Sequence, residues 1–425
     1  MTELVVNLAP VLRGAVRVPG DKSASHRAVL ISAMADGEST IEGLSTGDDV
    51  QRTLSIVEAL GASISTLDGK LSILGPHEGL VAATHPLDCG NSGTAMRLLA
   101  GVLTGVPGTH ELVGDESLMK RPMGRVIDPL RSMGAEISGA ANDLPPVAIV
   151  GGSTLAGIDY QVPTPSAQVK SAVLFAGLKA VGTTTVHEAI RTRKTTENML
   201  TEALVSVTSK DEGVGRVVSL QPGRPMPRHW HIPGDPSQAA FFAVLGLIHP
   251  NASIGVVKLL DEDERTGYIG VLQRMGGLIS QKVKDAHPAL QIRSSRLLAT
   301  EIFAAEIPSV DEVPVLMIAA AAATGVTSFR DMSELRIKES DRFAGSMMLA
   351  SSVGCEVWSE GDDFFVRGLG SATNFVHFAV DGGLDHRIVM AAAVAATAGR
   401  GGVIANWETV ESSYPQFFDD LSSIQ

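Results

Sequence analysis

The sequence predicts an α/β protein built from six copies of one β-α-β-α-β-β unit, grouped as two domains of three copies each. Two recurring patterns support this fold. An Ala-rich segment that ends at Gly or Asn and runs into β-branched residues occurs six times, starting at Ser25, Ser92, Ser166, Asp235, Asp311 and Asp385. Between these segments, an amphipathic helix runs into a glycine and a hairpin at a period of about 70–78 residues. Each unit is too small to fold alone, because a helix buried on all sides needs neighbouring units around it.

Each copy is expected to contain, in order, a buried helix, a strand, an amphipathic helix and a hairpin. The glycines that close the amphipathic helices are Gly61, Gly134, Gly276 and Gly354. In the third copy, Glu202–Val207 occupies this place in degenerate form. The sixth copy is expected to be truncated at a C-terminal helix after Pro415.

The domain boundaries follow from the first copy. One strand over Glu3–Val18 precedes that copy, so we expect it to complete the other domain. The chain then crosses twice, at a two-strand hinge near residues 19 and 234. The expected first domain is 1–19 plus 235–425 and the second is 20–234, with the substrate site in the cleft between them.

Composition limits the function. The chain of 425 residues has 34 Lys and Arg against 47 Asp and Glu, a formal charge of −13. General affinity for nucleic acid or an anionic membrane is therefore disfavoured, and an anion site must be a local concentration of cations. Cys89 and Cys355 provide neither a disulfide framework nor zinc spacing. Without a leader pattern or an apolar run of about 18 residues, we expect a soluble, cytoplasmic protein.

The start of the first buried helix carries an unusual set of side chains. Asp21 and Ser23 are both competent N-caps, and Lys22, His26 and Arg27 lie in the first turn. Cations there oppose the helix dipole. One interpretation is a solvated basic end. The other, which we favour, is that exposed N–H groups, hydroxyls and basic side chains await an anionic ligand.

The other helix starts carry similar groups. In chain order they are Asn91, Ser92, Gly93, Thr94 and Arg97; Ser166, Gln168 and Lys170; Asp311 and Glu312; and Asp385, His386 and Arg387. The fourth start, Asp235-Pro236-Ser237, is typical of ordinary capping.

Two further basic segments follow buried helices. Lys120 and Arg121 precede Pro122, and Arg336–Arg342 contains Lys338 and Glu339. Solvated ion pairs on a helix are the alternative for the second segment. With few carboxylates expected to face these cations, the inventory suits small substrates that carry phosphate and carboxylate groups. No Walker-type loop, GxGxxG motif or cluster with catalytic metal spacing is present in the sequence.

Six motifs follow one another along the chain: KSxSHR, GNSGTAMR, KRPMGR, SAQVKSA, LRIKESDR and DHRI. Together they resemble the family of 5-enolpyruvylshikimate-3-phosphate (EPSP) synthase, or 3-phosphoshikimate 1-carboxyvinyltransferase, and its bacterial branch in particular. The resemblance implies two inside-out α/β domains joined by a two-strand hinge. It also implies a cytoplasmic, monomeric enzyme of aromatic amino acid biosynthesis that needs no cofactor or metal. The enzyme would transfer the enolpyruvyl group of phosphoenolpyruvate (PEP) to the 5-hydroxyl of shikimate-3-phosphate and release phosphate.

The resemblance also implies roles for residues. Shikimate-3-phosphate would contact Lys22, Ser23, Arg27, Ser166, Ala167, Gln168, Arg193, Asp311 and Lys338. PEP would contact Lys22, Asn91, Gly93, Thr94, Arg121, Gln168, Arg342, His386 and Arg387. Asp311 would accept the 5-hydroxyl proton, and Glu339, with Lys22 as partner, would deliver a proton to the PEP methylene.

Three positions depart from the common family pattern. Ala167 stands where many members have Ser, RTRKTTE (191–197) replaces the usual Ser-Lys-Pro stretch, and Ser412 stands where many have Lys. Arg193, within RTRKTTE, is expected to supply the phosphate contact that Ala167 lacks. Glyphosate, a PEP analogue, inhibits the family; Gly93 favours inhibition of this chain, whereas Ser412 argues against it.

Two alternatives remain at this point. The sister family that uses UDP-N-acetylglucosamine usually has a Cys in the loop that here reads GDESLMKRP, and Cys89 is expected to be only a small buried residue. A non-enzymatic repeat scaffold predicts interchangeable polar loops, unlike the loops observed.

Overall fold

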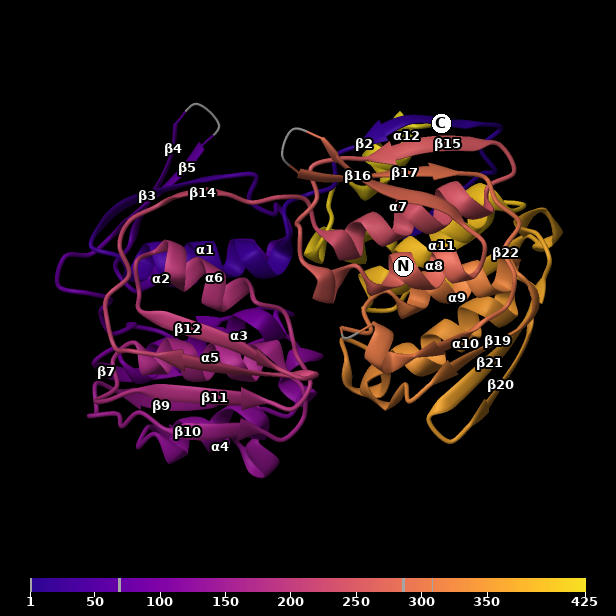
Figure 1. Ribbon diagram of the computed structural model, residues 1–425. Helices are drawn as coiled ribbons and strands as arrows, with labels where there is room; N and C mark the ends of the chain where they lie inside the picture. Colours follow the sequence, from indigo (N-terminus) through magenta and orange to yellow (C-terminus); the bar gives the residue numbers. More distant parts are fainter. Residues whose placement is uncertain (1, 68–69, 285–286, 308) are drawn as a thin grey trace. The chain divides into compact units, whose positions relative to one another are not determined.

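The computed structural model describes residues 2–67, 70–284, 287–307 and 309–425, which form two compact units (Figure 1). Unit 1 comprises the chain up to Asp21 together with Pro233–Gln425, and unit 2 comprises Lys22–Ile232. Among the described residues, no helix has the length and apolar character needed to cross a membrane.

Unit 2 contains three repeats in chain order. The first has α1 (Lys22–Met34), β3 (Gly37–Glu42), α2 (Asp48–Ala59), β4 (Ser63–Leu67) and β5 (Lys70–Gly75). The second has β6 (Leu87–Asp88), α3 (Gly93–Thr104), β7 (Gly108–Val113), α4 (Gly124–Ser132), β8 (Glu136–Ser138) and β9 (Val147–Gly151). The third has β10 (Asp159–Val162), α5 (Ala167–Gly177), β11 (Thr184–Glu188), α6 (Thr195–Glu202), β12 (Val207–Glu212) and β13 (Gly215–Leu220), and β14 (His229–His231) follows it.

Unit 1 begins with β1 (Glu3–Val6) and β2 (Leu12–Val16). Its first repeat has α7 (Pro236–Ile248), β15 (Ala252–Val256), α8 (Gly267–Arg274), β16 (Leu278–Lys284) and β17 (His287–Arg293). The second has β18 (Glu301–Phe303), α9 (Val313–Ala322), β19 (Thr324–Arg330), α10 (Arg342–Ser352), β20 (Glu356–Glu360) and β21 (Asp363–Leu369). The last has β22 (Phe378–Asp381), α11 (His386–Ala398), β23 (Gly402–Ala405) and α12 (Phe417–Ser423).

Six sheets form from the described residues and confirm the six-copy prediction. Five of them repeat one order: β14-β3-β5-β4, β6-β7-β9-β8, β10-β11-β13-β12, β2-β15-β17-β16 and β18-β19-β21-β20. In each, the first pair is parallel and the hairpin adds antiparallel strands. The sixth sheet, β1-β23-β22, has β1 where the others have a hairpin, as expected of a truncated copy.

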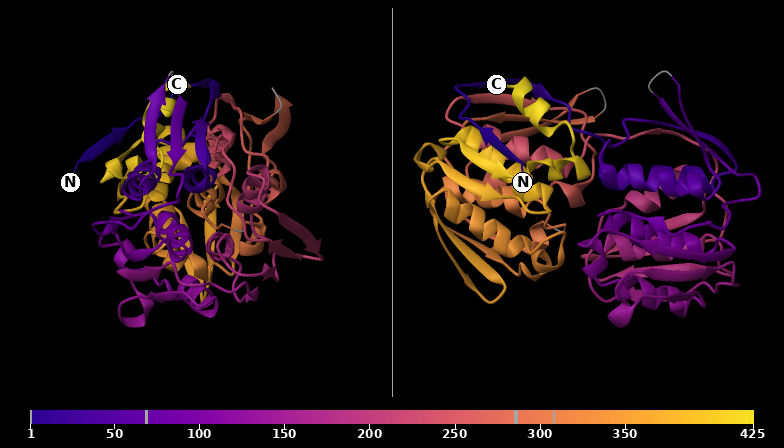
Figure 2. Two further views of the ribbon diagram at one scale, coloured as in Figure 1. Left: turned by 90° about the vertical axis from the view of Figure 1, so that its left-hand side faces the viewer. Right: turned by 180° about the vertical axis from the view of Figure 1, so that it is seen from behind.

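In each unit, the buried helices lie inside and the sheets lie outside, as Figure 2 shows from two directions. The buried helices are α1, α3 and α5 in unit 2 and α7, α9 and α11 in unit 1. Every residue of α7, α9 and α11 is buried, and these three helices pack on one another. In unit 2, α3 and α5 approach so closely that a Cβ on Gly101 would lie 2.1 Å from the carbonyl oxygen of Ala172. The Ala- and Gly-rich composition therefore serves close helix packing, and the inside-out α/β fold is confirmed.

The prediction of one N-terminal strand over Glu3–Val18 was wrong. The segment forms two strands in two sheets of unit 1, because β1 pairs antiparallel with β23 and β2 pairs parallel with β15. Pro10 lies between them, and a proline cannot donate to a ladder.

The chain passes between the units at two neighbouring segments. Gly20 and Gly234 form an antiparallel bridge, the N–H of Asp21 donates to Pro233 O at 2.8 Å, and the N–H of Asp235 donates to Pro19 O at 2.9 Å. The strand before each of these two segments pairs in a sheet of one unit, while the helix after it belongs to the other unit. β2, which precedes α1 in the chain, belongs to the sheet of α7, while β14, which precedes α7, belongs to the sheet of α1.

Candidate active site

The predicted site residues lie at or just before the N-terminal ends of helices and form one group in each unit. Those in unit 1 are Asp311, Lys338, Glu339, Arg342, His386 and Arg387. Those in unit 2 are Lys22, Ser23, Arg27, Asn91, Gly93, Thr94, Arg121, Ser166, Ala167, Gln168 and Arg193.

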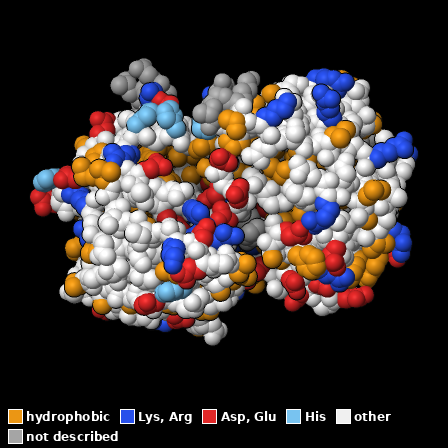
Figure 3. All heavy atoms as spheres, in the orientation of Figure 1, with side chains coloured by type: hydrophobic (Ala, Val, Ile, Leu, Met, Phe, Trp, Pro, Cys, Tyr) orange, Lys and Arg blue, Asp and Glu red, His pale blue; other side chains and the backbone are white. Residues whose placement is uncertain are grey.

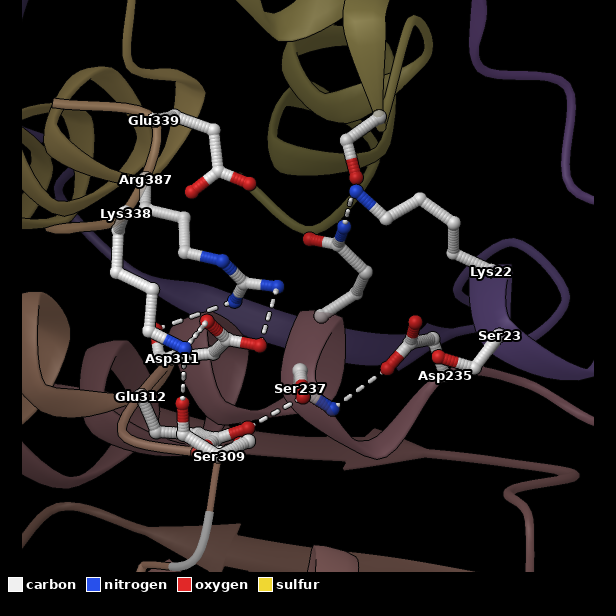
Figure 4. A network of polar contacts seen from close by, with 12 residues as sticks. Lys22, Ser23, Asp235, Ser237, Ser309, Asp311, Glu312, Lys338, Glu339 and Arg387 are labelled. Carbon is white, nitrogen blue, oxygen red and sulfur yellow. Dashed lines mark hydrogen bonds and ion pairs between the residues drawn. The ribbon is translucent and has the colours of Figure 1, made fainter. Parts of the chain in front are cut away.

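Asp311 is the centre of the group in unit 1 (Figure 4). It lies just before Glu312, the N-cap of α9. Its Oδ1 is 2.9 Å from Arg342 Nη1 and 3.8 Å from Lys338 Nζ, and its Oδ2 is 3.8 Å from Arg387 Nη2. Burial by itself would raise the pKa of Asp311, but these three cations outweigh burial and hold the pKa well below its usual range. The side chain is 24% exposed, so a ligand can reach this ionised carboxylate.

Arg342 is buried among three carboxylates. Its Nε and Nη2 donate to Asp385 at 2.8 and 3.2 Å, its Nη1 donates to Asp311 at 2.9 Å, and its Nη2 is 2.5 Å from Glu339. Asp385 also caps α11 by accepting the N–H of Arg387 at 3.0 Å. The expectation of few carboxylates facing the cations was therefore wrong, because a buried guanidinium requires such partners. A ligand anion at Arg342 has to share it with these acids.

The segment from Arg336 to Arg342 had two interpretations, solvated ion pairs and anion binding, and each fits some of its residues. Arg336 stacks over the Phe343 ring at 3.8 Å and pairs with Asp341 at 3.8 Å, as a surface pattern would. Lys338 instead turns inward, donating to Ser309 O at 3.0 Å. The turn between Ser333–Ile337 and α10 therefore delivers Lys338, Glu339 and Arg342 to Asp311 while leaving Arg336 outside.

The start of α11 adds His386 and Arg387 to this group. Arg387 Nη1 donates to the backbone oxygen of Asp311 at 3.2 Å. His386 Nδ1 lies 3.2 Å from Ser412 Oγ, whose hydroxyl donates to Thr409 O at 2.8 Å. Ser412 therefore contacts a predicted PEP residue from the position where many family members have Lys.

The fourth helix start is capped as predicted, and a polar network that the sequence did not indicate surrounds it. Asp235 accepts the N–H of Ser237 at 2.8 Å. Buried Arg265 donates to Asp21 and Asp235, both at 2.6 Å, and to Ser237 Oγ at 2.9 Å. Ser237 in turn donates to Glu312 (Figure 4). Arg265 stands in the run DEDER, which is typical of a solvated surface, so only the fold shows that it is buried.

In unit 2, the three basic residues at the start of α1 have different environments. Lys22 Nζ pairs with Asp49 at 2.9 Å and is partly exposed. Arg27 is buried and donates to Thr196, to Ser171 and to the backbone oxygen of Ser23. Burial, followed by the charges of Lys22 and Arg27, holds the pKa of His26 well below its usual range. The expectation that all three await a ligand as cations was therefore wrong for His26, which is neutral at pH 7.

Arg193 lies beside Ser23, as its predicted phosphate role requires. Its Nη1 donates to Ser23 Oγ at 2.5 Å. Ser166 caps α5 by accepting the N–H of Val169 at 3.3 Å, and Ala167 follows as the first helical residue. Lys170, one turn further on, is fully buried and pairs with two glutamates at 2.8 and 2.6 Å, so it supports the fold and does not face a ligand.

The start of α3 is joined to the start of α5 through Gln168. The side-chain amide of Gln168 donates to Thr94 Oγ1 at 2.9 Å and accepts from Arg97 Nη1 at 2.8 Å. Arg121 donates to Asn91 Oδ1 at 2.6 Å. A Cβ on Gly93 would lie 2.8 Å from Arg97 Nη1 and 3.3 Å from Arg121 Nη1. The lack of a side chain at Gly93 therefore leaves room for two guanidinium groups.

The fold and the helix-start groups of cations, hydroxyls and carboxylates define an α/β enzyme for small anionic substrates. The model of the family EPSP synthase (3-phosphoshikimate 1-carboxyvinyltransferase) matches residues 8–421. The chain belongs to this family, which confirms the resemblance seen in its motifs.

Curated relatives cover the whole chain. The 3-phosphoshikimate 1-carboxyvinyltransferase of Streptococcus uberis is 39% identical over 431 residues, covering 100% of this chain and 99% of the relative. That of an Anaeromyxobacter species is 41% identical over 421 residues, covering 97% and 96%. Each relative carries the activity that the sequence resemblance implied.

Solved structures agree. The EPSP synthase of Acinetobacter baumannii matches with a TM-score of 0.85 at 35% identity, covering 99% of this chain and 98% of that one. The enolpyruvyl transferase NikO from Streptomyces tendae matches with a TM-score of 0.79 at 18% identity, a likeness of fold alone.

Proposed function

We propose that the chain transfers the enolpyruvyl group of PEP to the 5-hydroxyl of shikimate-3-phosphate and releases phosphate. The observation that carries this proposal is Asp311, an ionised and accessible carboxylate beside Lys338, Arg342 and Arg387. A carboxylate among cations can accept a proton from an alcohol while the cations bind the anionic parts of the substrates. The groups in units 1 and 2 would together bind this one pair of substrates.

For shikimate-3-phosphate, the proposed phosphate ligands are Ser23, Ser166, Gln168 and Arg193. The bond from Arg193 to Ser23 supports this role, because it places the guanidinium beside a phosphate-binding hydroxyl. Ala167 offers no hydroxyl, so the charge of Arg193 compensates for one missing neutral hydrogen bond. Arg27 is buried and acts through the Ser23 carbonyl that it holds. Lys338 and Asp311 bind the hydroxyls of the ring.

For PEP, the proposed ligands are Lys22, Asn91, Gly93, Thr94, Arg121, Gln168, Arg342, His386 and Arg387. In the free protein, Asn91 anchors Arg121, the carboxylates of Asp311 and Asp385 anchor Arg342, and the backbone oxygen of Asp311 anchors Arg387. Because their positions are set in advance, little ordering is needed when the ligand binds.

In the proposed reaction, the substrate oxygen bonds to C2 of PEP while its proton passes to Asp311, and Glu339, with Lys22 as partner, protonates C3. The resulting tetrahedral intermediate loses the C3 proton and phosphate, and the new double bond remains on the acceptor. A carboxylate with a lowered pKa is a weak base in the free enzyme. When the substrates bind, their negative charges offset the positive charges of the cations, and this raises the basicity of Asp311 for the reaction.

The test is phosphate release from PEP with each of two acceptors. We expect release with shikimate-3-phosphate and none with UDP-N-acetylglucosamine. Release only with the second acceptor would assign the chain to the sister activity, and release with neither would refute both. We also propose that the enzyme is a cytoplasmic monomer, and light scattering of the active enzyme tests whether it is monomeric.

A further inference from the structure

A second group of chemically reactive side chains lies on the surface of unit 2, apart from the residues used above. Glu42 ends β3, and His229 and His231 begin and end β14. One ligand atom from each of the three can be chosen so that all lie within 4.8 Å of one another. The sequence showed no metal spacing here, because Glu42 and the histidines are distant in the chain and meet only when β14 pairs with β3.

The sheet register explains why these side chains share a face. β14 and β3 are parallel, with His229 opposite Thr40 and His231 opposite Glu42. Residues two apart on a strand point to the same side, so both imidazoles and the carboxylate stand together on one face. Figure 3 shows histidine side chains gathered on the surface over β5 and β14.

The distances suit coordination of one ion. The Nε2 atoms of His229 and His231 are 3.1 Å apart, and His229 Nε2 is 3.7 Å from Glu42 Oε1. Two ligands at about 2.0–2.1 Å from a tetrahedral ion are separated by roughly 3.3 Å. His229 and His231 are 44% and 63% exposed, so an ion can enter and water can complete its coordination.

Neighbouring groups orient these ligands. His229 Nδ1 is hydrogen-bonded to Thr40 Oγ1, and when Nδ1 carries the proton, Nε2 presents its lone pair to an ion. Lys70 Nζ lies 2.5 Å from Glu42 Oε1 and competes for the carboxylate. The site therefore combines two imidazoles, one shared carboxylate and one opposing cation.

We propose that Glu42, His229 and His231 bind one divalent transition-metal ion of the Zn²⁺ or Ni²⁺ type. Two imidazoles and a carboxylate favour such ions over Mg²⁺ and Ca²⁺, which prefer all-oxygen ligands. The ion fastens β14 to β3, two strands whose paired residues Thr40 and His229 are 189 positions apart. Because β14 leads directly to the segment at Pro233 where the chain leaves unit 2, the ion stabilises this end of the unit.

The test is calorimetric titration of the full, untagged chain with ZnCl₂ after removal of metal by a chelator. We expect one Zn²⁺ per chain, no binding of Mg²⁺, and an increase of the thermal unfolding temperature by Zn²⁺. His229→Ala and His231→Ala each weaken Zn²⁺ binding by at least about tenfold. His77→Ala is the matched control, since exposed His77 pairs with Asp36 and does not belong to the group of Glu42, His229 and His231, so its loss leaves the affinity unchanged.

Lys70→Gln distinguishes loss of a metal ligand from loss of folding, because this variant is expected to bind Zn²⁺ more tightly. Removing this positive charge from Glu42 tightens Zn²⁺ binding by about threefold to tenfold, an effect that unfolding cannot mimic. Equal affinities in the wild type, His229→Ala and His231→Ala, or no gain in Lys70→Gln, would overturn the proposal. The result is independent of the proposed transferase activity, because binding and unfolding are measured without substrates.

Discussion

Gly93→Ala tests whether the start of α3 borders the PEP pocket. The added Cβ would lie 2.8 Å from Arg97 Nη1 and 3.3 Å from Arg121 Nη1. The first contact is about 0.7 Å shorter than a favourable separation of about 3.5 Å. Both guanidinium groups must therefore move, and they hold Gln168 and Asn91 at 2.8 and 2.6 Å.

The magnitude follows from the kind of neighbour. Overpacking costs about 1–3 kcal/mol, and the lower end of this range applies because the contacted atoms end flexible side chains. A cost of about 1–1.5 kcal/mol corresponds to a roughly fivefold to tenfold rise in the KM for PEP. Glyphosate is longer than PEP and needs more of the same space, so its inhibition constant rises by a larger factor than the KM.

The assay is steady-state phosphate release at varied PEP and glyphosate concentrations. Gly270→Ala is the control, because among the described residues a Cβ on Gly270 meets no atom within 4 Å beyond its own helix backbone and chain neighbours, so both constants stay unchanged. Equal increases in KM and inhibition constant for Gly93→Ala would show that Gly93 does not border the part of the pocket that distinguishes the two ligands.

Three further predictions concern stability. Leu204 has φ +61° and is 68% exposed, so Leu204→Gly is expected to raise the free energy of unfolding by about 0.5–1 kcal/mol, measured by urea titration. A loss of stability would show that the contacts of the Leu204 side chain outweigh the strain of its backbone. Arg265→Met leaves Asp21 and Asp235 buried without their cation and lowers the unfolding free energy by about 3–5 kcal/mol; a loss below about 1 kcal/mol would refute a central role for this arginine. The pKa of His26 is lowered from 6.5, so below pH 6.5 the unfolded chain binds a proton there that the folded chain does not, and stability falls as pH falls by up to about 1.4 kcal/mol per unit. His26→Asn removes this component, and an unchanged pH profile in that variant would contradict the assignment.

The repeats made the fold predictable from the sequence. Gly61, Gly134, Gly276 and Gly354 all have positive φ where a helix turns into a hairpin. Their period therefore reported a physical requirement of the backbone. The third copy looked degenerate because Leu204 adopts the same left-handed conformation without being a glycine. The N-terminal segment was predicted less well, since no local signal says that β1 and β2 join different sheets.

The sequence predicted the cationic residues of the site better than the carboxylates that pair with them. Lys22, Arg342 and Arg387 stand in recognisable motifs at helix starts. The partner Asp49 belongs to another helix, and the coordination of Arg342 by three acids depends on tertiary packing. The lowered pKa of His26 likewise results from burial, whereas the sequence predicted that the side chains at this helix start face a ligand.

The most direct test of the central claim is turnover by Asp311→Asn, measured as phosphate release from PEP and shikimate-3-phosphate. The substitution keeps the shape of the side chain and removes its ability to accept a proton. We predict a loss of at least about a hundredfold in turnover, with shikimate-3-phosphate binding largely intact by calorimetry. Asp419→Asn, at an exposed position of α12, is the matched control and keeps full turnover. Near wild-type turnover in Asp311→Asn would contradict the account and remove Asp311 from the mechanism.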